Sequence, residues 1–211
     1  MDMFEHWLDF EDSPKGKCVK ISGLHCSGLP FEFNAKVGIH TMTLLEAKMQ
    51  NSKGEESSLT CCSHADSNYK FIIDKIASLP INGQQEEILF KNSDKYMKTL
   101  EPQLKQDFLE NSGIDVDALS EHDKLFLTST LGKMSEFFFE DKSLGEGIVT
   151  DFSILGDGNI WASVQNKPDN PVETRNDAIK ISAITSIGEV PQFLNEEQSS
   201  MISQADDLVQ E

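Results

Sequence analysis

The sequence predicts an α+β fold in two parts: a small unit of two strands and two helices, followed by a mainly helical domain that contains a β-hairpin. Three observations predict it. Short extended segments open the chain, apolar residues at helical spacing recur after them, and the charge is uneven. Residues 1–84 hold 11 acidic and 8 basic side chains, whereas residues 85–211 hold 25 and 10. The domain boundary is therefore placed at residue 84, ahead of a strongly acidic second domain.

The first unit is predicted from four segments of residues 1–84. Segments 17–24 and 30–37 alternate apolar and polar residues around the turn-rich sequence HCSG, which is typical of two strands. Helix formers at 44–49 predict a short helix. Segment 67–80 has apolar residues at helical spacing, a polar N-cap and a terminal proline, which predict a second helix.

The second unit, residues 85–211, is predicted to be mainly helical with one hairpin. Asp157 and Gly158 are strong turn residues between two alternating runs, and Gly113 closes a stripe of apolar residues. The two helices that precede the hairpin are expected to pack on each other. The predicted elements are helices at 93–113, 115–141 and 193–209, a hairpin at 147–165 and a strand within 177–190.

Charge and composition argue against several classes of function. A net charge of −18 disfavours nucleic-acid binding, because phosphates are neutralised by clustered lysine and arginine. No apolar run is long enough for a transmembrane segment, and the acidic N-terminus lacks the features of a secretory signal peptide. Four cysteines are too few for a disulfide scaffold, which indicates a reducing compartment such as the cytoplasm. No cofactor is predicted.

Cysteines and histidines in the first unit raise two chemical alternatives. One is a zinc site, although the spacings Cys-x7-Cys and Cys-Cys differ from the usual Cys-x2-Cys pairs. The other is a nucleophilic Cys26 or Cys61 with His40 or His64 as its base. The candidate zinc ligands are Cys18, His25, Cys26, His40, Cys61, Cys62 and His64.

Four acidic residues of the second unit are candidates for an acid/base pair or a metal site: Glu140, Glu146, Asp151 and Asp157. Asp157 is better explained by its hairpin turn, and the other three by exposure on the surface. The run of phenylalanines at 137–139 is interpreted as packing between a helix and the hairpin.

The order of motif residues from Cys18 to about Leu79 resembles the U-box, the zinc-free relative of the RING domain in ubiquitin ligases. The resemblance covers about 60 residues, but both loop prolines of the family are missing and a methionine replaces its tryptophan. The matching positions are Cys18 and Ile21 for the first loop, Pro30 for the strand start, Gly38 for the turn before the central helix, Met49 for the tryptophan, Cys61 and Cys62 for the second loop, and Asn68 for the start of the last helix.

This resemblance implies an E3 ubiquitin ligase without a catalytic nucleophile or a metal of its own. Its partner would be a ubiquitin-conjugating enzyme charged with ubiquitin, held in a reactive arrangement while ubiquitin passes to an unknown host substrate. The implied docking patch consists of Ile21, Leu45, Met49, Cys62 and Ser63.

The C-terminal sequence NEEQSSMISQADDLVQE resembles the secretion signals of Legionella type IV effector proteins. Such a signal implies delivery into a host cytoplasm, where a bacterial ubiquitin ligase would find its partners. The acidic second half supports a different alternative. Under this hypothesis the chain is a non-catalytic binding or inhibitor protein, for example an immunity-type protein that masks the basic surface of a toxin.

Overall fold

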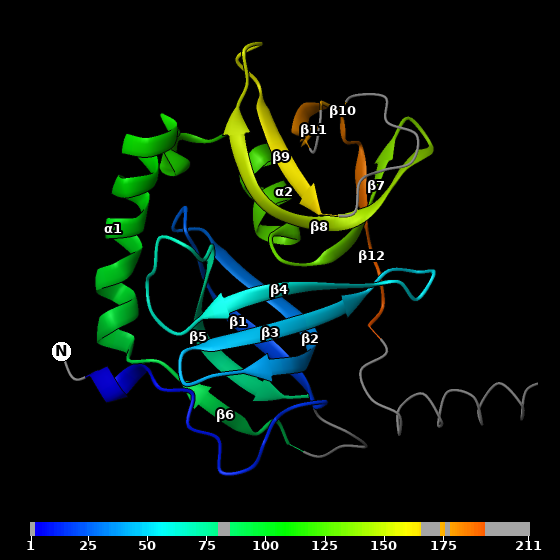
Figure 1. The fold of residues 1–211 in the computed structure, drawn as a ribbon. Helices are drawn as coiled ribbons and strands as arrows, with labels where there is room; N and C mark the ends of the chain where they lie inside the picture. Colours follow the sequence, from blue (N-terminus) through cyan, green and yellow to red (C-terminus); the bar gives the residue numbers. More distant parts are fainter. Residues whose placement is uncertain (1–2, 80–84, 166–173, 176–177, 193–211) are drawn as a thin grey trace, which may run out of the picture.

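The computed structural model describes residues 3–79, 85–165, 174–175 and 178–192, and it contains two six-stranded β-sheets with a helical connection between them (Figure 1). The predicted α+β fold with a mainly helical second half is therefore wrong. Neither α-helix of the described chain has the length and apolar character needed to cross a membrane.

The first sheet closes into a barrel, because β1 pairs with β2 on one side and with β5 on the other. β4 and β5 run parallel and the other neighbours are antiparallel. β6 pairs with the second half of β5, beyond the two residues that pair with β4. This sheet extends to Lys91, beyond the boundary predicted at residue 84. Its strands are β1 (Cys18–His25), β2 (Pro30–His40), β3 (Leu44–Gln50), β4 (Glu56–Cys62), β5 (Phe71–Ser78) and β6 (Ile88–Lys91).

The two helices predicted in this half, at 44–49 and 67–80, are wrong, because those segments form β3 and β5. In β3, Leu45, Ala47 and Met49 are buried and alternate with partly exposed residues, which is the period of a strand. The residues are good helix formers, but pairing with β2 and β4 overrides that weak preference. The expected U-box-like order of two strands and two helices is therefore not formed.

The second sheet has the order β10-β11-β9-β8-β7-β12, and the long β8 curves through its middle (Figure 1). The hairpin predicted at 147–165 is confirmed as β8 and β9, and the strand predicted within 177–190 is confirmed as β11 and β12. The helix predicted at 193–209 lies outside the described residues. The strands are β7 (Met134–Phe139), β8 (Lys142–Ile154), β9 (Ile160–Gln165), β10 (Thr174–Arg175), β11 (Ala178–Lys180) and β12 (Ser186–Glu189).

The connection between the sheets contains α1 (Asp94–Ser112) and α2 (Glu121–Thr130). The helix predicted at 93–113 is confirmed, with Ser93 accepting a hydrogen bond from the backbone N–H of Tyr96 and Gly113 ending it at a φ of 76°. The helix predicted at 115–141 is mostly wrong, because only α2 is α-helical and β7 follows it. Short 3₁₀ turns complete the fold at Met3–His6, Val116–Ala118 and Ile181–Ala183.

The two helices bury their apolar faces on different surfaces instead of on each other. α1 covers the outer wall of the barrel, where Met97, Leu100 and Leu104 pack against Ile72. α2 packs against β2 and β8, between the two sheets.

One continuous hydrophobic core joins the barrel interior to the inner face of the second sheet. Ile21 and Phe33 belong to it from the barrel, and Leu127, Phe137 and Ile148 belong to it from the second half. A core shared in this way predicts that the two halves fold together rather than as separate modules.

Gly132, in the turn between α2 and β7, fits closely against the barrel. A Cβ added there would lie 2.6 Å from Cδ1 of Phe33, and the φ of 78° is itself unfavourable for other residues. Gly132→Ala is expected to lower the free energy of unfolding in urea by about 2–4 kcal/mol, from backbone strain plus overpacking. The matched control is Gly158→Ala, which has a φ of 77° and no atom within 4 Å of the added Cβ. Equal losses in the two variants would contradict this packing.

Candidate functional site

The five residues of the implied docking patch do not form a surface. Ile21, Leu45 and Met49 lie in the core and are at most 1% exposed. Cys62 and Ser63, at the end of β4 and just beyond it, are fully buried. A conjugating enzyme cannot bind these side chains in this fold.

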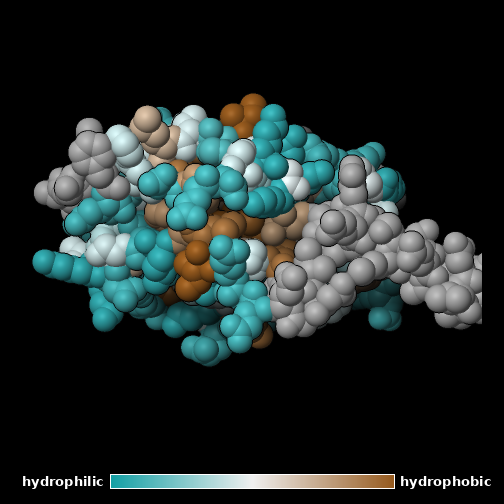
Figure 2. Space-filling model, turned by 90° about the horizontal axis from the view of Figure 1, so that it is seen from below, coloured by the Kyte–Doolittle hydropathy of each residue, from teal (hydrophilic) through white to brown (hydrophobic). Residues whose placement is uncertain are grey.

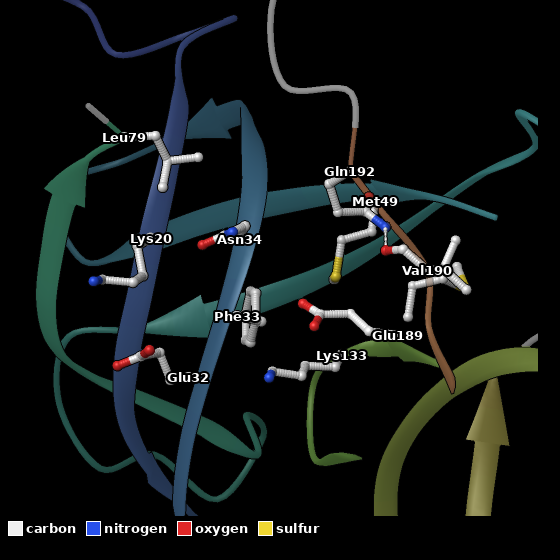
Figure 3. A pocket seen from close by; sticks show the side chains of 11 residues that line it. Lys20, Glu32, Phe33, Asn34, Met49, Leu79, Lys133, Glu189, Val190 and Gln192 are labelled. Atoms are coloured by element: carbon white, nitrogen blue, oxygen red, sulfur yellow. Dashed lines mark hydrogen bonds between the residues drawn. The ribbon is translucent and has the colours of Figure 1, made fainter. Parts of the chain in front are cut away.

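Met49 does reach the wall of a small cavity of about 270 Å³ beside the barrel (Figure 3). The cavity is lined by Phe33 and by equal numbers of lysines and glutamates, so it has no charge preference. Gln192 closes one side: its amide group hydrogen bonds the backbone N–H and C=O of Gln50 at 2.8 and 3.0 Å. The cavity thus marks where the segment after β12 is fastened to the barrel.

A second surface feature lies at the barrel end away from the second sheet. Figure 2, the view from below, shows apolar atoms gathered in the middle of this face with hydrophilic ones around them. The N-terminal segment is fastened to the barrel by the Leu8 N–H, which donates to the Met42 carbonyl at 2.7 Å, and Phe10 packs edge-on against His40. We assign no function to this face.

The strongest candidate site is a cleft of about 650 Å³ at the junction of the two sheets, which we call the junction cleft. Most of its lining comes from the loop 63–70 between β4 and β5, the C-terminal half of α1 and the end of β8, and Cys26 after β1 and Ile72 of β5 complete it. Apolar side chains form much of its wall, with Phe108 of α1 packed against Phe152 of β8 at a ring separation of 5.0 Å.

His25 lies beside this cleft at the end of β1 and ties the barrel to the second sheet. It is fully buried, and its Nε2 is 2.9 Å from the Thr150 carbonyl oxygen in β8. The backbone N–H of Ser27 donates to Nδ1, so Nδ1 is the acceptor and Nε2–H donates to Thr150. Burial lowers the pKa of His25 to about 4, because the cost of burying a charge outweighs the opposing effect of Asp151. The imidazole is therefore neutral near pH 7.

Neither candidate nucleophile is activated. Burial raises the pKa of both the Cys26 and Cys61 thiols to about 12, so both remain protonated near neutral pH. The imidazole next to Cys26 is His25, not the His40 or His64 of the sequence hypothesis, and its two nitrogens already have hydrogen-bond partners. The arrangement does not support cysteine catalysis.

The predicted zinc ligands are dispersed over the barrel, and all four cysteines are free. Cys62 contacts His64, with Sγ 3.5 Å from Nδ1, and Cys18 and Cys61 are buried among the apolar residues of the barrel. Within the described residues, one group has the geometry for a metal ion, and it consists of His25, Cys26 and Asp151. Two of these were in the predicted zinc set, and Asp151 joins them from the second half.

The charges of the junction cleft are mainly negative. Three carboxylates line it, from Asp66, Asp107 and Asp151, against the single ammonium group of Lys70. Lys70 forms a salt bridge with Asp151, with Nζ 2.7 Å from Oδ2. The last turn of α1 adds the negative end of the helix dipole and contains no basic residue.

Of the other acidic candidates, Glu140 is exposed in the turn between β7 and β8 at a φ of 41°, as expected, and Asp157 and Glu146 have structural roles. Asp157 accepts hydrogen bonds from the Asn159 backbone and the Trp161 indole, as its predicted turn role requires, and these hold its pKa down to about 2. Glu146 hydrogen bonds to Ser52 across the two halves. Phe137 is buried near Phe126 of α2, which confirms the packing interpretation for that residue.

Sequence reasoning missed most of the cleft, including Lys70, Asp107 and Phe108. Their only signal was polar or aromatic character at positions far apart in the chain, and nothing in the sequence placed them together. Comparisons with protein-family models, with curated proteins and with solved structures find no match for this chain.

Proposed function

We propose that the protein is a non-catalytic binding protein whose junction cleft takes up a positively charged side chain of a partner protein. The observation that carries this proposal is a cleft with three carboxylates and an aromatic wall, next to a thiol and an imidazole that are both in unreactive forms.

Electrostatics favour a cationic group at this site. Asp66 and Asp107 line the cleft together with the Lys70–Asp151 pair, in which Lys70 neutralises Asp151. The cleft therefore has an excess of negative charge, which the C-terminal end of α1 increases. The net charge of −18 also attracts a basic partner surface at longer range and speeds its association with the protein.

The wall of the cleft suits the aliphatic stem of lysine or the flat guanidinium of arginine. Tyr69 and Phe108 line the cleft together with Phe152, and aromatic rings attract cations through their faces. A long basic side chain can place its carbons against these rings while its charge reaches the carboxylates.

The test is a titration with an arginine-, glycine- and leucine-containing decapeptide, compared with a peptide in which glutamate replaces arginine. In amide NMR spectra of the full chain, the cationic peptide is expected to shift residues in 65–70, 104–112 and 151–154, and the anionic one is not. Shifts spread over the whole surface, or none, would contradict the assignment of the cleft.

Two side chains of α1 provide a matched pair of variants. Asp107 and Glu110 each accept a hydrogen bond from a glutamine four residues earlier, but only Asp107 lines the cleft. Asp107→Asn is expected to weaken binding of the cationic peptide about threefold, since an exposed charge contributes up to about 1 kcal/mol. Glu110→Gln removes the same charge and is expected to change the affinity far less. Equal losses would indicate attraction by net charge alone.

The ligase and effector hypotheses stay predictions from the sequence. They rest on the order of the motif residues and on the C-terminal sequence, while the fold leaves the implied patch buried. Incubation with ubiquitin, activating enzyme, ATP and a panel of conjugating enzymes separates them from the binding proposal. The binding proposal predicts no ubiquitin chains, and chain formation would contradict its non-catalytic role.

A further inference from the structure

We propose that His25, Cys26 and Asp151 bind one transition-metal ion of the Zn²⁺ class at the floor of the junction cleft, where the ion links the barrel to the second sheet. This inference concerns the metal alone and does not depend on what partner the cleft takes up.

The ligand atoms are already close to the spacing of a tetrahedral site. Nε2 of His25 lies 3.7 Å from Sγ of Cys26 and 3.9 Å from Oδ1 of Asp151. All three atoms lie within 4.8 Å of one another. Zinc bonds of about 2.0–2.3 Å in a tetrahedron place ligand atoms about 3.3–3.8 Å apart. The ion therefore requires Cys26 and Asp151 to move toward each other by up to about 1 Å and the Thr150 carbonyl, now 2.9 Å from Nε2, to give up its place to the ion.

The chemical identity of the three ligands selects the class of metal. Imidazole and thiolate favour zinc and similar borderline ions, whereas magnesium and calcium require oxygen ligands throughout. One carboxylate oxygen is compatible with zinc.

Neighbouring groups can orient the ligands as outer partners. Ser27 Oγ lies 2.9 Å from Nδ1 of His25 and can accept a hydrogen bond from Nδ1–H when Nε2 binds the ion. Lys70 holds Oδ2 of Asp151, while Oδ1 is the oxygen near His25. Lys70 is not an outer partner of this kind but a competing cation, because its ammonium group already neutralises the carboxylate.

Binding changes the protonation of two ligands in a balanced way. The imidazole stays neutral: the Nε2 proton passes to water and the Nε2 lone pair binds the ion, while Nδ1 takes up a proton from water and its N–H donates a hydrogen bond to Ser27 Oγ. The bond from Nε2–H to the Thr150 carbonyl and the bond from the Ser27 N–H are then lost. The Cys26 thiol loses its proton to water, so one proton is released per ion.

The fourth coordination position faces the cleft, because Cys26 and Asp151 both line it. A water molecule fills that position in the simplest site, as in zinc sites with three protein ligands.

The test is a titration of the metal-free full chain with Co²⁺, followed by competition with Zn²⁺. The expected result is one equivalent of Co²⁺ with a thiolate-to-cobalt absorption band that Zn²⁺ removes. Cys26→Ser is expected to abolish this band, and Asp151→Asn to weaken binding at least tenfold. Lys70→Met, which removes the competing cation at a half-exposed side chain, is expected to tighten binding several-fold.

The control is Cys62→Ser, because Cys62 also has a histidine neighbour but no third ligand in the described residues. It is expected to keep the band. Absence of a thiolate band in the wild-type chain overturns the proposal, and so does a band that survives Cys26→Ser and disappears in Cys62→Ser. Lys70→Met keeps the test decisive if Cys26→Ser fails to fold, because unchanged or weaker binding in that variant contradicts the assigned position of the ion.

Discussion

Replacing Ile21 by alanine is expected to lower the free energy of unfolding by about 2–5 kcal/mol, the range for large-to-small changes in a packed core. Ile21 is fully buried in β1, where it is paired with Phe33 of β2 and Ile76 of β5. All three side chains belong to the same core. The smaller residue leaves a cavity that the closed barrel cannot readily collapse.

Urea unfolding of both proteins measures this loss. Ile88→Ala is the matched control, because it removes the same atoms from a side chain that is 59% exposed, and it is expected to cost less than about 0.5 kcal/mol. A docking role for Ile21 predicts the opposite outcome, with unchanged stability and loss of binding to a conjugating enzyme. That result would contradict the barrel.

Replacing His25 by leucine is expected to destabilise the metal-free protein by about 2–4 kcal/mol. The substitution keeps the site filled but leaves the Thr150 carbonyl and the Ser27 N–H without their partner, and buried polar groups without partners are costly. The effect should be strongest on β8, since this hydrogen bond joins it to β1.

Amide hydrogen exchange and urea unfolding check this prediction together. Exchange is expected to rise around Thr150 and at the end of β1, with a smaller change in the far strands of the second sheet. His122→Leu serves as the control, because the His122 side chain is 60% exposed and the partner of its Nδ1 is the neighbouring, surface-lying Asp123 rather than a residue of the other half. A loss for His25→Leu no larger than that of the control would show that the bond to Thr150 does not join the two halves.

Local signals predicted the elements whose structure depends on neighbours in the chain. α1 has a serine cap, an apolar stripe and a closing glycine within one stretch of sequence. The β8–β9 hairpin has Asp157 and Gly158 in its turn, and both elements form as predicted. In each case the deciding interactions are made within about twenty residues.

Elements decided by distant pairing were predicted wrongly. β3 contains residues with high helix propensity. It forms a strand because it pairs with β2 and β4, and this pairing buries every second side chain. The U-box resemblance depended on Pro30 and Gly38, and both residues have different structural roles in the barrel. Pro30 opens β2, and Gly38 lies where the pairing of β2 with β3 shifts register.

The candidate site was visible in sequence only in fragments. His25 and Cys26 stood out as metal ligands, but their partners Thr150 and Asp151 are about 125 residues away in a strand of the other sheet. Sequence spacing carries no signal for such a contact. The junction cleft therefore emerges only when both halves are folded against each other.

The most direct test of this account is whether the two halves unfold as one. Trp7 lies in the N-terminal segment, whose next residue Leu8 is fastened to the barrel, and Trp161 lies buried in β9 of the second sheet. Urea unfolding of Trp7→Phe and Trp161→Phe, followed by the fluorescence of the remaining tryptophan, reports each half separately. The shared core predicts that each variant's fluorescence transition coincides with its own far-ultraviolet circular dichroism. A fluorescence transition displaced from that of the whole chain would contradict a single unit with its binding site at the junction.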